Sequence, residues 1–143
     1  MVIVLGSIIY DEERNEFEVT RFIGSGNFGT VYEIRKRLDG SLFALKTLQT
    51  PFAEQTALKA FVNEGTLATK ISHRNVIRYL YFHDGSVFQG LPPYIIMELA
   101  NGGTLFQLLE SRKSNSQMFS NAELKELFLQ LIDGMEAINS LLV

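Results

Sequence analysis

The sequence contains no cysteine, and this absence excludes disulfide bonds, thiolate metal sites and a cysteine nucleophile. Only two histidines are present, His73 and His83, so a metal centre built from several imidazoles is excluded as well. Neither histidine has a carboxylate or hydroxyl partner in a recognisable triad pattern, and we expect a packing or surface role for both. We therefore expect no metal-ligating residue in this sequence.

Clustered positive charge and long hydrophobic runs are also lacking. The 13 lysines and arginines form no block and are outnumbered by 16 aspartates and glutamates, which argues against a dedicated nucleic-acid-binding protein. The apolar opening at residues 1–5 has no preceding cationic region, ends at Gly6 and is too short to span a bilayer. We expect neither a nucleic-acid nor a membrane partner, and a cytoplasmic location.

What is present is typical of a globular protein. The 143 residues are 46% hydrophobic and 20% charged, which is too apolar for a disordered tail and suits one compact domain. Residues 17–23 and 30–35 alternate apolar and polar side chains, as half-buried strands do. An Asp-Gly turn leads to a third strand over residues 41–48. The connections are too short for crossover helices, so these strands are expected to be antiparallel.

The pattern changes to a helical one after Pro51. Apolar residues at helical spacing predict a helix over about residues 53–70. Gly65 lies inside it and costs about 1 kcal/mol relative to alanine, so this helix is not strongly self-supporting. Two more strands are expected at residues 76–82 and 94–98.

The last third of the chain is expected to be helical. A short helix is predicted from Thr104 to about residue 111, followed by a loop over residues 112–117. Ser120 and Glu123 have the spacing of a capping box, which predicts a final helix running to the end of the chain. The expected fold is α+β: an antiparallel sheet of about five strands with one helix against it, followed by a helical segment.

A glycine-rich turn separates the first two predicted strands. Residues 24–29 read Gly-Ser-Gly-Asn-Phe-Gly and fit the pattern G-x-G-x-x-G, which is a weak signal alone because functionless glycine turns are common. A dinucleotide-binding fold would need a helix to start inside the motif, and a strand follows instead. Strand, glycine turn and strand is the order found where backbone N–H groups cover the phosphates of ATP in protein kinases.

At this point the sequence resembles the protein kinase family, in register over nearly the whole chain. Residues 23–32 match the glycine-rich loop, residues 43–46 match the strand motif that carries the phosphate-binding lysine, and Glu64 follows Lys46 by 18 residues. Residues 73–77 and 94–105 resemble the entry to the fourth strand and the fifth strand with its hinge. Residues 130–138 resemble the helix that precedes the catalytic loop. The resemblance implies a kinase-like N-lobe over residues 1–100 and an incomplete helical C-lobe segment over residues 101–143.

The resemblance also implies a site for ATP. Lys46 would contact the α- and β-phosphates, and Glu64 would hold it in place through an ion pair. Glu98 and Ala100 would offer backbone groups to the adenine edge, and Met97 would guard the pocket behind it. The residues that would bind the nucleotide are Ile23, Gly24, Ser25, Gly26, Asn27, Phe28, Gly29, Val31, Ala44, Lys46, Met97, Glu98, Ala100 and Thr104.

Among these, four have further roles in the family. Val31 and Ala44 would sandwich the adenine, Thr104 would contact the ribose, and Phe28 would shield the phosphates from water.

The sequence contains neither the His-Arg-Asp motif nor the Asp-Phe-Gly motif, which carry the catalytic base and the Mg²⁺ ligands in the family. The chain alone is therefore expected to be inactive, with the Mg²⁺ ligands in the missing part of the C-lobe.

The favoured function is the ATP-binding portion of a protein kinase whose full-length form transfers the γ-phosphoryl group of ATP to protein hydroxyls. Serine/threonine specificity is favoured by frequency alone. One alternative is a catalytically inactive, truncated kinase-like module that binds or regulates a partner. A second, a nicotinamide-dependent oxidoreductase, is disfavoured by the strand after the glycine turn and by Lys46. The broad apolar face of the helix over residues 121–143 predicts self-association through that helix.

Overall fold

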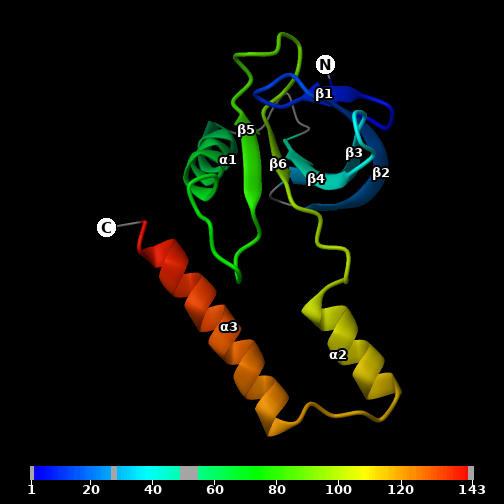
Figure 1. Ribbon diagram of the computed structural model, residues 1–143, viewed down its shortest axis with the longest axis vertical. Coiled ribbons are helices and arrows are strands. Elements are labelled where there is room, and N and C mark those ends of the chain that lie inside the picture. The colour runs from blue at the N-terminus through cyan, green and yellow to red at the C-terminus, as the bar shows by residue number, and fades with distance from the viewer. Residues whose placement is uncertain (1, 27–28, 49–54, 142–143) are drawn as a thin grey trace. The chain divides into compact units, whose positions relative to one another are not determined.

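The computed structural model describes residues 2–26, 29–48 and 55–141. Contacts divide the chain into two compact units. The sheet unit comprises residues 1–72 and 77–99, and the helical unit comprises residues 73–76 and 100–143. The elements of both units are labelled in Figure 1.

The described residues of the sheet unit contain one antiparallel sheet with the strand order β1-β2-β3-β4-β6-β5. Figure 1 shows β2, β3 and β4 curving strongly. The strands are β1 (Ile8–Tyr10), β2 (Glu16–Gly26), β3 (Gly29–Lys36), β4 (Leu42–Thr47), β5 (Tyr79–His83) and β6 (Tyr94–Met97).

The sheet has six strands in the described residues, one more than the five expected. The additional strand β1 is only three residues long, too short to show an alternating pattern. It pairs with β2 through Ile9 opposite Phe17, and Ile9 is fully buried. Ile and Tyr both favour strands, and pairing with β2 together with the burial of Ile9 places the segment in the sheet.

Two apolar clusters lie on the two faces of the sheet. The first contains Ile9, Ile34, Leu45 and Tyr94 among its buried residues. The second contains Ala44, Phe61, Ile95 and Met97, with Tyr79 and Phe82 packed against it. Neighbouring residues such as Ala44 and Leu45 point to opposite clusters because successive side chains of a strand alternate between faces.

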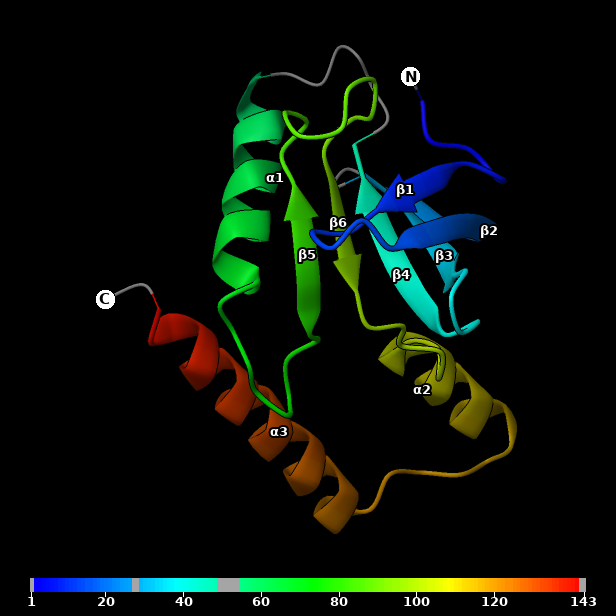
Figure 2. The same ribbon diagram turned by 45° about the horizontal axis from the view of Figure 1, so that its top comes forward.

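Helix α1 (Gln55–Ala68) lies along β5 and covers the second cluster, as Figure 2 shows for the helix and strand. Its buried residues are Phe61 and Gly65. A Cβ atom on Gly65 would lie 2.3 Å from Cδ2 of Phe82 on β5, so the close approach of helix and strand depends on this glycine. The expected start of the helix at residue 53 lies outside the described residues.

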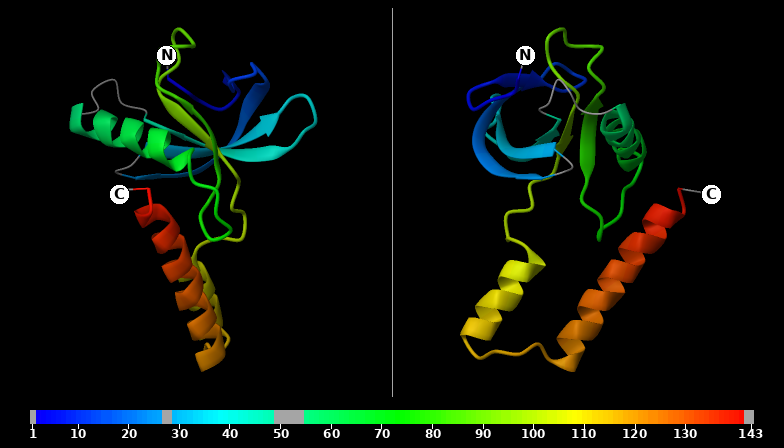
Figure 3. Two further views of the ribbon diagram at one scale, coloured as in Figure 1. Left: turned by 60° about the vertical axis from the view of Figure 1, so that its left-hand side comes forward. Right: turned by 180° about the vertical axis from the view of Figure 1, so that it is seen from behind.

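The described part of the helical unit contains α2 (Leu105–Ser114) and α3 (Asn121–Asn139), joined by residues 115–120. Figure 3 shows this connection. The capping box predicted at Ser120 and Glu123 is confirmed, and Thr104 forms a second one with Gln107 at the start of α2. Arg112 and Glu123 connect the two helices through a bidentate ion pair with distances of 2.8 and 3.1 Å.

Three predicted boundaries were wrong. The loop expected over residues 112–117 begins later, because residues 112–114 continue α2. The strand expected from residue 76 begins at Tyr79, because Val76 forms a local turn in which its N–H donates to the carbonyl of His73. The final helix ends at Asn139 rather than at the chain end.

In the described residues, none of the helices has the length and apolar character that crossing a membrane requires.

Candidate functional site

The glycine-rich turn connects β2 and β3 within the sheet. Gly24 pairs with Val31, Ser25 with Thr30, and Gly26 with Gly29, so the two strands are paired in register from Gly24 to Gly26, after a register shift between Phe22 and Gly24. Ile23 precedes this paired segment on β2 and is exposed. Asn27 and Phe28, which the sequence analysis placed in the site, lie outside the described residues.

The glycines of this turn differ in whether the backbone conformation and the packing require glycine. Gly29 has φ of +110°, and a Cβ atom there would lie 2.5 Å from the carbonyl oxygen of Thr47, so the backbone itself requires glycine. Among the described residues, nothing lies within 4 Å of a Cβ atom built on Gly24 or Gly26, and neither has a positive φ. No conformation or packing in the described residues requires these two glycines, which leaves room for a bound group to approach the backbone.

The expected ion pair between Lys46 and Glu64 is present. Nζ of Lys46 lies 2.8 Å from both Oε1 and Oε2 of Glu64. The Lys46 side chain is 15% exposed and that of Glu64 is 32% exposed, so the pair is only partly shielded from solvent. Short, charge-assisted bonds to both carboxylate oxygens fix the position of the ammonium group.

The fold positions both charges. Lys46 lies on β4 opposite Val31 of β3, next to the strands that form the glycine-rich turn. Glu64 lies on α1 beside Gly65, where the helix packs closely on Phe82 of β5. Nζ of Lys46 also lies 6.0 Å from the ring centroid of Phe61, one turn before Glu64 on the same helix. The sheet and the helix that packs on it thus bring the two charges together.

Tyr79, which was not among the residues expected from the sequence, belongs to this arrangement. Its hydroxyl donates a hydrogen bond to Oε1 of Glu64 at 2.6 Å. Burial raises the pKa of the Tyr79 phenol, and the hydrogen bond to the Glu64 carboxylate raises it further, so the phenol stays protonated and able to donate. Glu64 therefore accepts hydrogen bonds from two different strands, β4 and β5.

No periodicity signal could have found Tyr79, because the strand is irregular there. Tyr79 pairs with Met97 and Tyr81 with Ile96, so Leu80 is an extra residue on β5. Residues two apart normally share one face of a sheet, but this irregularity places Tyr79 with the second cluster and Tyr81 with the first.

Two of the residues expected at the adenine, Ala44 and Met97, are paired neighbours in the sheet. Ala44 on β4 pairs with Met97 on β6, and Met97 pairs with Tyr79 on β5. Ala44 and Met97 are buried and belong to the second cluster, with Val31 packed against it. These residues form an apolar layer on the face of the sheet that carries Lys46.

The remaining predicted contacts follow β6. The Glu98 N–H donates to the carbonyl oxygen of Arg78 at 2.9 Å, which ties the end of β6 to the start of the β5 segment. Ala100 and Thr104 belong to the helical unit. The Thr104 hydroxyl accepts the N–H of Gln107 at 3.1 Å as the cap of α2. The structure does not test the ribose contact predicted for Thr104, which stays a prediction.

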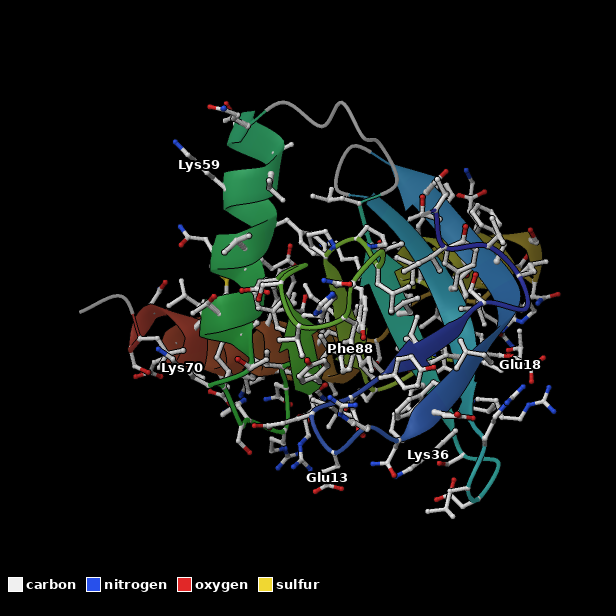
Figure 4. All side chains as sticks on the ribbon, turned by 90° about the horizontal axis from the view of Figure 1, so that it is seen from above. Glu13, Glu18, Lys36, Lys59, Lys70 and Phe88 are labelled. Atoms are coloured by element: carbon white, nitrogen blue, oxygen red, sulfur yellow. The ribbon has the colours of Figure 1, made fainter. Side chains whose placement is uncertain are left out.

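Within the part of the chain that the structure describes, the two histidines and one cavity contribute nothing to the ion pair of Lys46 and Glu64. Nδ1 of His73 accepts the N–H of Asn75 within a turn, and His83 is buried against Phe88 and Tyr94. One cavity of about 620 Å³ is lined by residues of α1, of β5 and of the segments that follow β1, α1 and β5, but not by Lys46 or Glu64. Figure 4 shows Lys70 and Phe88 of its lining. The described residues contain no group of three histidine, aspartate or glutamate side chains placed to hold a metal ion.

Comparison with known proteins connects this geometry to a family. The family model described as "Protein kinase domain" matches residues 17–143. Wee1-like protein kinase 1-B of Xenopus laevis is 34% identical over 132 residues, which cover 88% of this chain and 21% of that protein. The relative named "Probable serine/threonine-protein kinase nek1", of Dictyostelium discoideum, is 31% identical over 118 residues, covering 82% of this chain and 23% of that protein.

The chain thus spans between a fifth and a quarter of the length of these relatives. The matched region begins in β2 and includes the glycine-rich turn, Lys46, Glu64 and both helices that follow β6. The family model matches 127 of the 143 residues, from 17 to 143, and the strand lysine forms an ion pair with the helix glutamate. The chain therefore belongs to the protein kinase family.

Proposed function

We propose that this chain is the ATP-binding portion of a protein kinase whose full-length form transfers the γ-phosphoryl group of ATP to hydroxyl groups of proteins. The observation that carries the proposal is the ion pair between Lys46 and Glu64 at 2.8 Å, on the face of the sheet next to the glycine-rich turn. Catalysis of phosphoryl transfer depends largely on positioning the phosphates and stabilising their charge. The Lys46 ammonium group, held beside the glycine-rich turn, could serve both purposes.

Several of the described residues support the proposed nucleotide site. Gly24 and Gly26 leave their backbone open to a phosphate group, and Lys46 supplies a compact positive charge held by Glu64. The apolar layer of Val31, Ala44 and Met97 offers a surface for a flat base. We assign the nucleotide to these groups, with the backbone of Glu98 and Ala100 reading the adenine edge.

Mg²⁺ enters the proposal only through the whole protein. In the family reaction bound Mg²⁺ neutralises charge on the phosphates. The described residues hold no cluster able to bind a metal ion, and the sequence has no Asp-Phe-Gly motif, so we assign no step in this chain to the metal. We propose that the Mg²⁺ ligands and the base that accepts the substrate hydroxyl proton lie in the remainder of a kinase domain.

Nucleotide binding can be tested directly on the 143-residue chain. Titration with a fluorescent ATP analogue should show saturable binding that ATP competes away. Lys46→Met should weaken it about tenfold or more, since hydrogen bonds to charged groups are worth about 1.5–3 kcal/mol. Lys59→Met is the matched control, because Lys59 lies exposed on α1 (Figure 4) and its loss removes the same charge. Equal weakening by the two variants, or no binding by the unmodified chain, would contradict the proposal.

Phosphoryl transfer should be absent from the chain by itself. In the transfer, the bond from the γ-phosphorus to its bridging oxygen breaks, a bond to the substrate hydroxyl oxygen forms, and the hydroxyl proton passes to a base. The 143 residues lack the motif that carries this base in the family. Incubation with radiolabelled ATP and a protein substrate should give no incorporation. Incorporation that Lys46→Met abolishes would show that another residue supplies the base.

Serine/threonine specificity is part of the same proposal. It is supported by the name of the Dictyostelium relative, which describes a serine/threonine-protein kinase. A longer form of the protein that includes a catalytic loop should phosphorylate peptides that contain serine or threonine and leave matched tyrosine peptides unmodified. Preferential labelling of the tyrosine peptides would overturn this assignment while leaving ATP binding intact.

We further propose that the chain self-associates through α3. Phe128, Leu131, Ile132 and Met135 are each between 55% and 62% exposed, an unusual amount of large apolar side chain for one helix. A second copy of the helix would cover these side chains. Sedimentation of the purified chain should show association that Leu131→Glu prevents. A monomer at all concentrations, with a helix that exchanges its amides rapidly, would contradict this.

A further inference from the structure

Tyr79 is the second of two side chains that donate hydrogen bonds to the Glu64 carboxylate. Nζ of Lys46 contacts both carboxylate oxygens at 2.8 Å, and the Tyr79 hydroxyl contacts Oε1 at 2.6 Å. The two donors come from β4 and β5, and the acceptor comes from α1. A phenol in a short bond to a carboxylate is among the stronger hydrogen bonds in proteins.

We propose that Tyr79 is a positioning residue of the nucleotide site, which holds Glu64, and through it Lys46, at the place where the phosphates bind. The inference rests on the proposed function, because it assigns Tyr79 a part in the ATP site described above. Tyr79 acts through Glu64, and no contact of Tyr79 with the nucleotide is needed.

The irregularity of β5 supports this assignment. The extra residue Leu80 turns the Tyr79 side chain toward the second cluster, although Tyr81 and His83, on the same strand, pack with the first. Irregularities of this kind re-aim single side chains and are frequent next to functional sites. Without the extra residue, strand alternation would place Tyr79 on the face opposite to Glu64.

The position of Tyr79 is fixed by the sheet rather than by the helix. It pairs with Met97, which pairs with Ala44, so it continues the row of residues assigned to the adenine. Helix α1 touches the sheet through Phe61 and Gly65, both against Phe82 of β5. These contacts are apolar and set the distance of the helix, whereas the Tyr79 hydroxyl adds a directional bond that sets the Glu64 carboxylate.

The rotational freedom of Glu64 explains why such a bond matters. A glutamate side chain has several rotatable bonds, and holding it in one arrangement opposes its conformational entropy. A second donor on Oε1 favours the arrangement that also faces Lys46. In Tyr79→Phe, Glu64 keeps Lys46 as a partner but loses the link to β5, so the ion pair becomes free to move with the helix.

A double-mutant cycle on the 143-residue chain tests the proposal. Tyr79→Phe keeps the ring in the cluster and should weaken binding of the fluorescent ATP analogue about three- to tenfold. In a Glu64→Ala background the same substitution should change the dissociation constant by less than about twofold. Tyr81→Phe, on the same strand but packed in the first cluster, is the matched control and should leave binding unchanged.

A nuclear magnetic resonance measurement tests the hydrogen bond between Tyr79 and Glu64 independently of its effect on nucleotide binding. With labelled tyrosine, the Tyr79 hydroxyl proton should give a downfield, slowly exchanging signal that disappears in Glu64→Ala, whereas loss of packing alone would not remove it selectively. A Tyr79→Phe dissociation constant equal to that of the unmodified chain, or an equal loss in the Glu64→Ala background, overturns the inference. If the unmodified chain binds no analogue, the proposed function fails, and the hydroxyl signal still decides whether Tyr79 holds Glu64.

Discussion

The two units of the chain bury their apolar residues to very different degrees. In the sheet unit, Tyr94, Ile34, Leu45 and Ile95 are less than 2% exposed and belong to two clusters on opposite faces of the sheet. Among the described residues of the helical unit, Gly134 of α3 alone is buried, and α2 has no buried residue. The large apolar side chains of α3 are mostly more than 40% exposed.

This difference separates two sources of stability. The sheet unit has a core of its own, and burying each large side chain contributes about 1.5–3 kcal/mol. The helices of the other unit are held by local features, namely two capping boxes and the ion pair of Arg112 with Glu123. Such features contribute about 0.5–2 kcal/mol per cap and less for an exposed ion pair, so they define helix ends without making a packed unit.

A pair of leucine substitutions should give the largest contrast between the units. Leu45→Ala removes a side chain that is 0% exposed and should cost about 2–5 kcal/mol of unfolding free energy. Leu131→Ala removes one that is 55% exposed and should change it by about 0.5 kcal/mol or less.

Urea unfolding of dilute protein, followed by circular dichroism, measures both values. Dilution matters because self-association through α3 would bury Leu131 and raise its apparent contribution. A cost for Leu131→Ala that approaches that of Leu45→Ala at all concentrations would show that α3 is covered within a single chain. The distinction between the two units would then fail.

How much of this could be predicted from the sequence depends on how local each signal is. The capping box of Ser120 and Glu123 was predicted because all its determinants lie within four residues. The pairing of Lys46 with Glu64 was expected from spacing within a family resemblance rather than from any local pattern. The short strand β1 was missed, because three residues are too few to show an alternating pattern and its pairing through Ile9 and Phe17 is not a local signal.

Tyr79 shows a different limit of sequence analysis. Periodicity assigns residues to faces on the assumption that a strand is regular, and the extra residue Leu80 reverses the assignment for every residue before it. Nothing in the identity of Leu80 marks it as extra. The hydrogen bond from Tyr79 to Glu64 therefore appears only when the register of β5 against β6 is known.

Two glycine substitutions should give a smaller contrast. Alanine favours a helix over glycine by about 1 kcal/mol, so Gly→Ala at an open position would stabilise α1 or α3. At Gly65 the new methyl group would lie 2.3 Å from the Phe82 ring, and overpacking costs about 1–3 kcal/mol. Gly65→Ala should therefore lower the unfolding free energy of the sheet unit by up to about 2 kcal/mol, despite its better helix propensity.

Gly134→Ala tests the corresponding position in the helical unit. Its methyl group would lie 2.9 Å from the carbonyl oxygen of Asn75, which is backbone and cannot rotate away as a side chain can. Because residues 73–76 and α3 belong to the helical unit, this substitution should speed amide exchange in that turn while leaving urea unfolding of the sheet unit unchanged. Stabilisation by both substitutions would show that neither helix packs closely at its glycine.

The smallest predicted effect is that of pH on stability, and it should differ between the two units. His83 in the sheet unit is buried, and neither ring nitrogen has a hydrogen-bond partner among the described residues. Burial lowers the pKa of His83 from its usual 6.5, and the backbone of Leu91, followed by the charge of Asp84, opposes this only in part. The unfolded chain therefore binds a proton at higher pH than the folded chain does, and the sheet unit should lose stability as the pH falls below about 6.5.

The helical unit should respond in a lower window of pH. The guanidinium of Arg112, followed by the N–H of Ser120, lowers the pKa of Glu123 from 4.5 to about 2. Its contribution to stability is complete above about pH 4.5 and is lost as the pH falls toward 2, where the folded chain also takes up the proton. Between pH 4.5 and 6.5, stability should thus fall through His83 and not through Glu123. Chemical denaturation across this range measures the slope, which His83→Leu should flatten and Glu123→Gln should leave in place. An unchanged slope in His83→Leu would mean that the folded sheet unit accepts the charged imidazole.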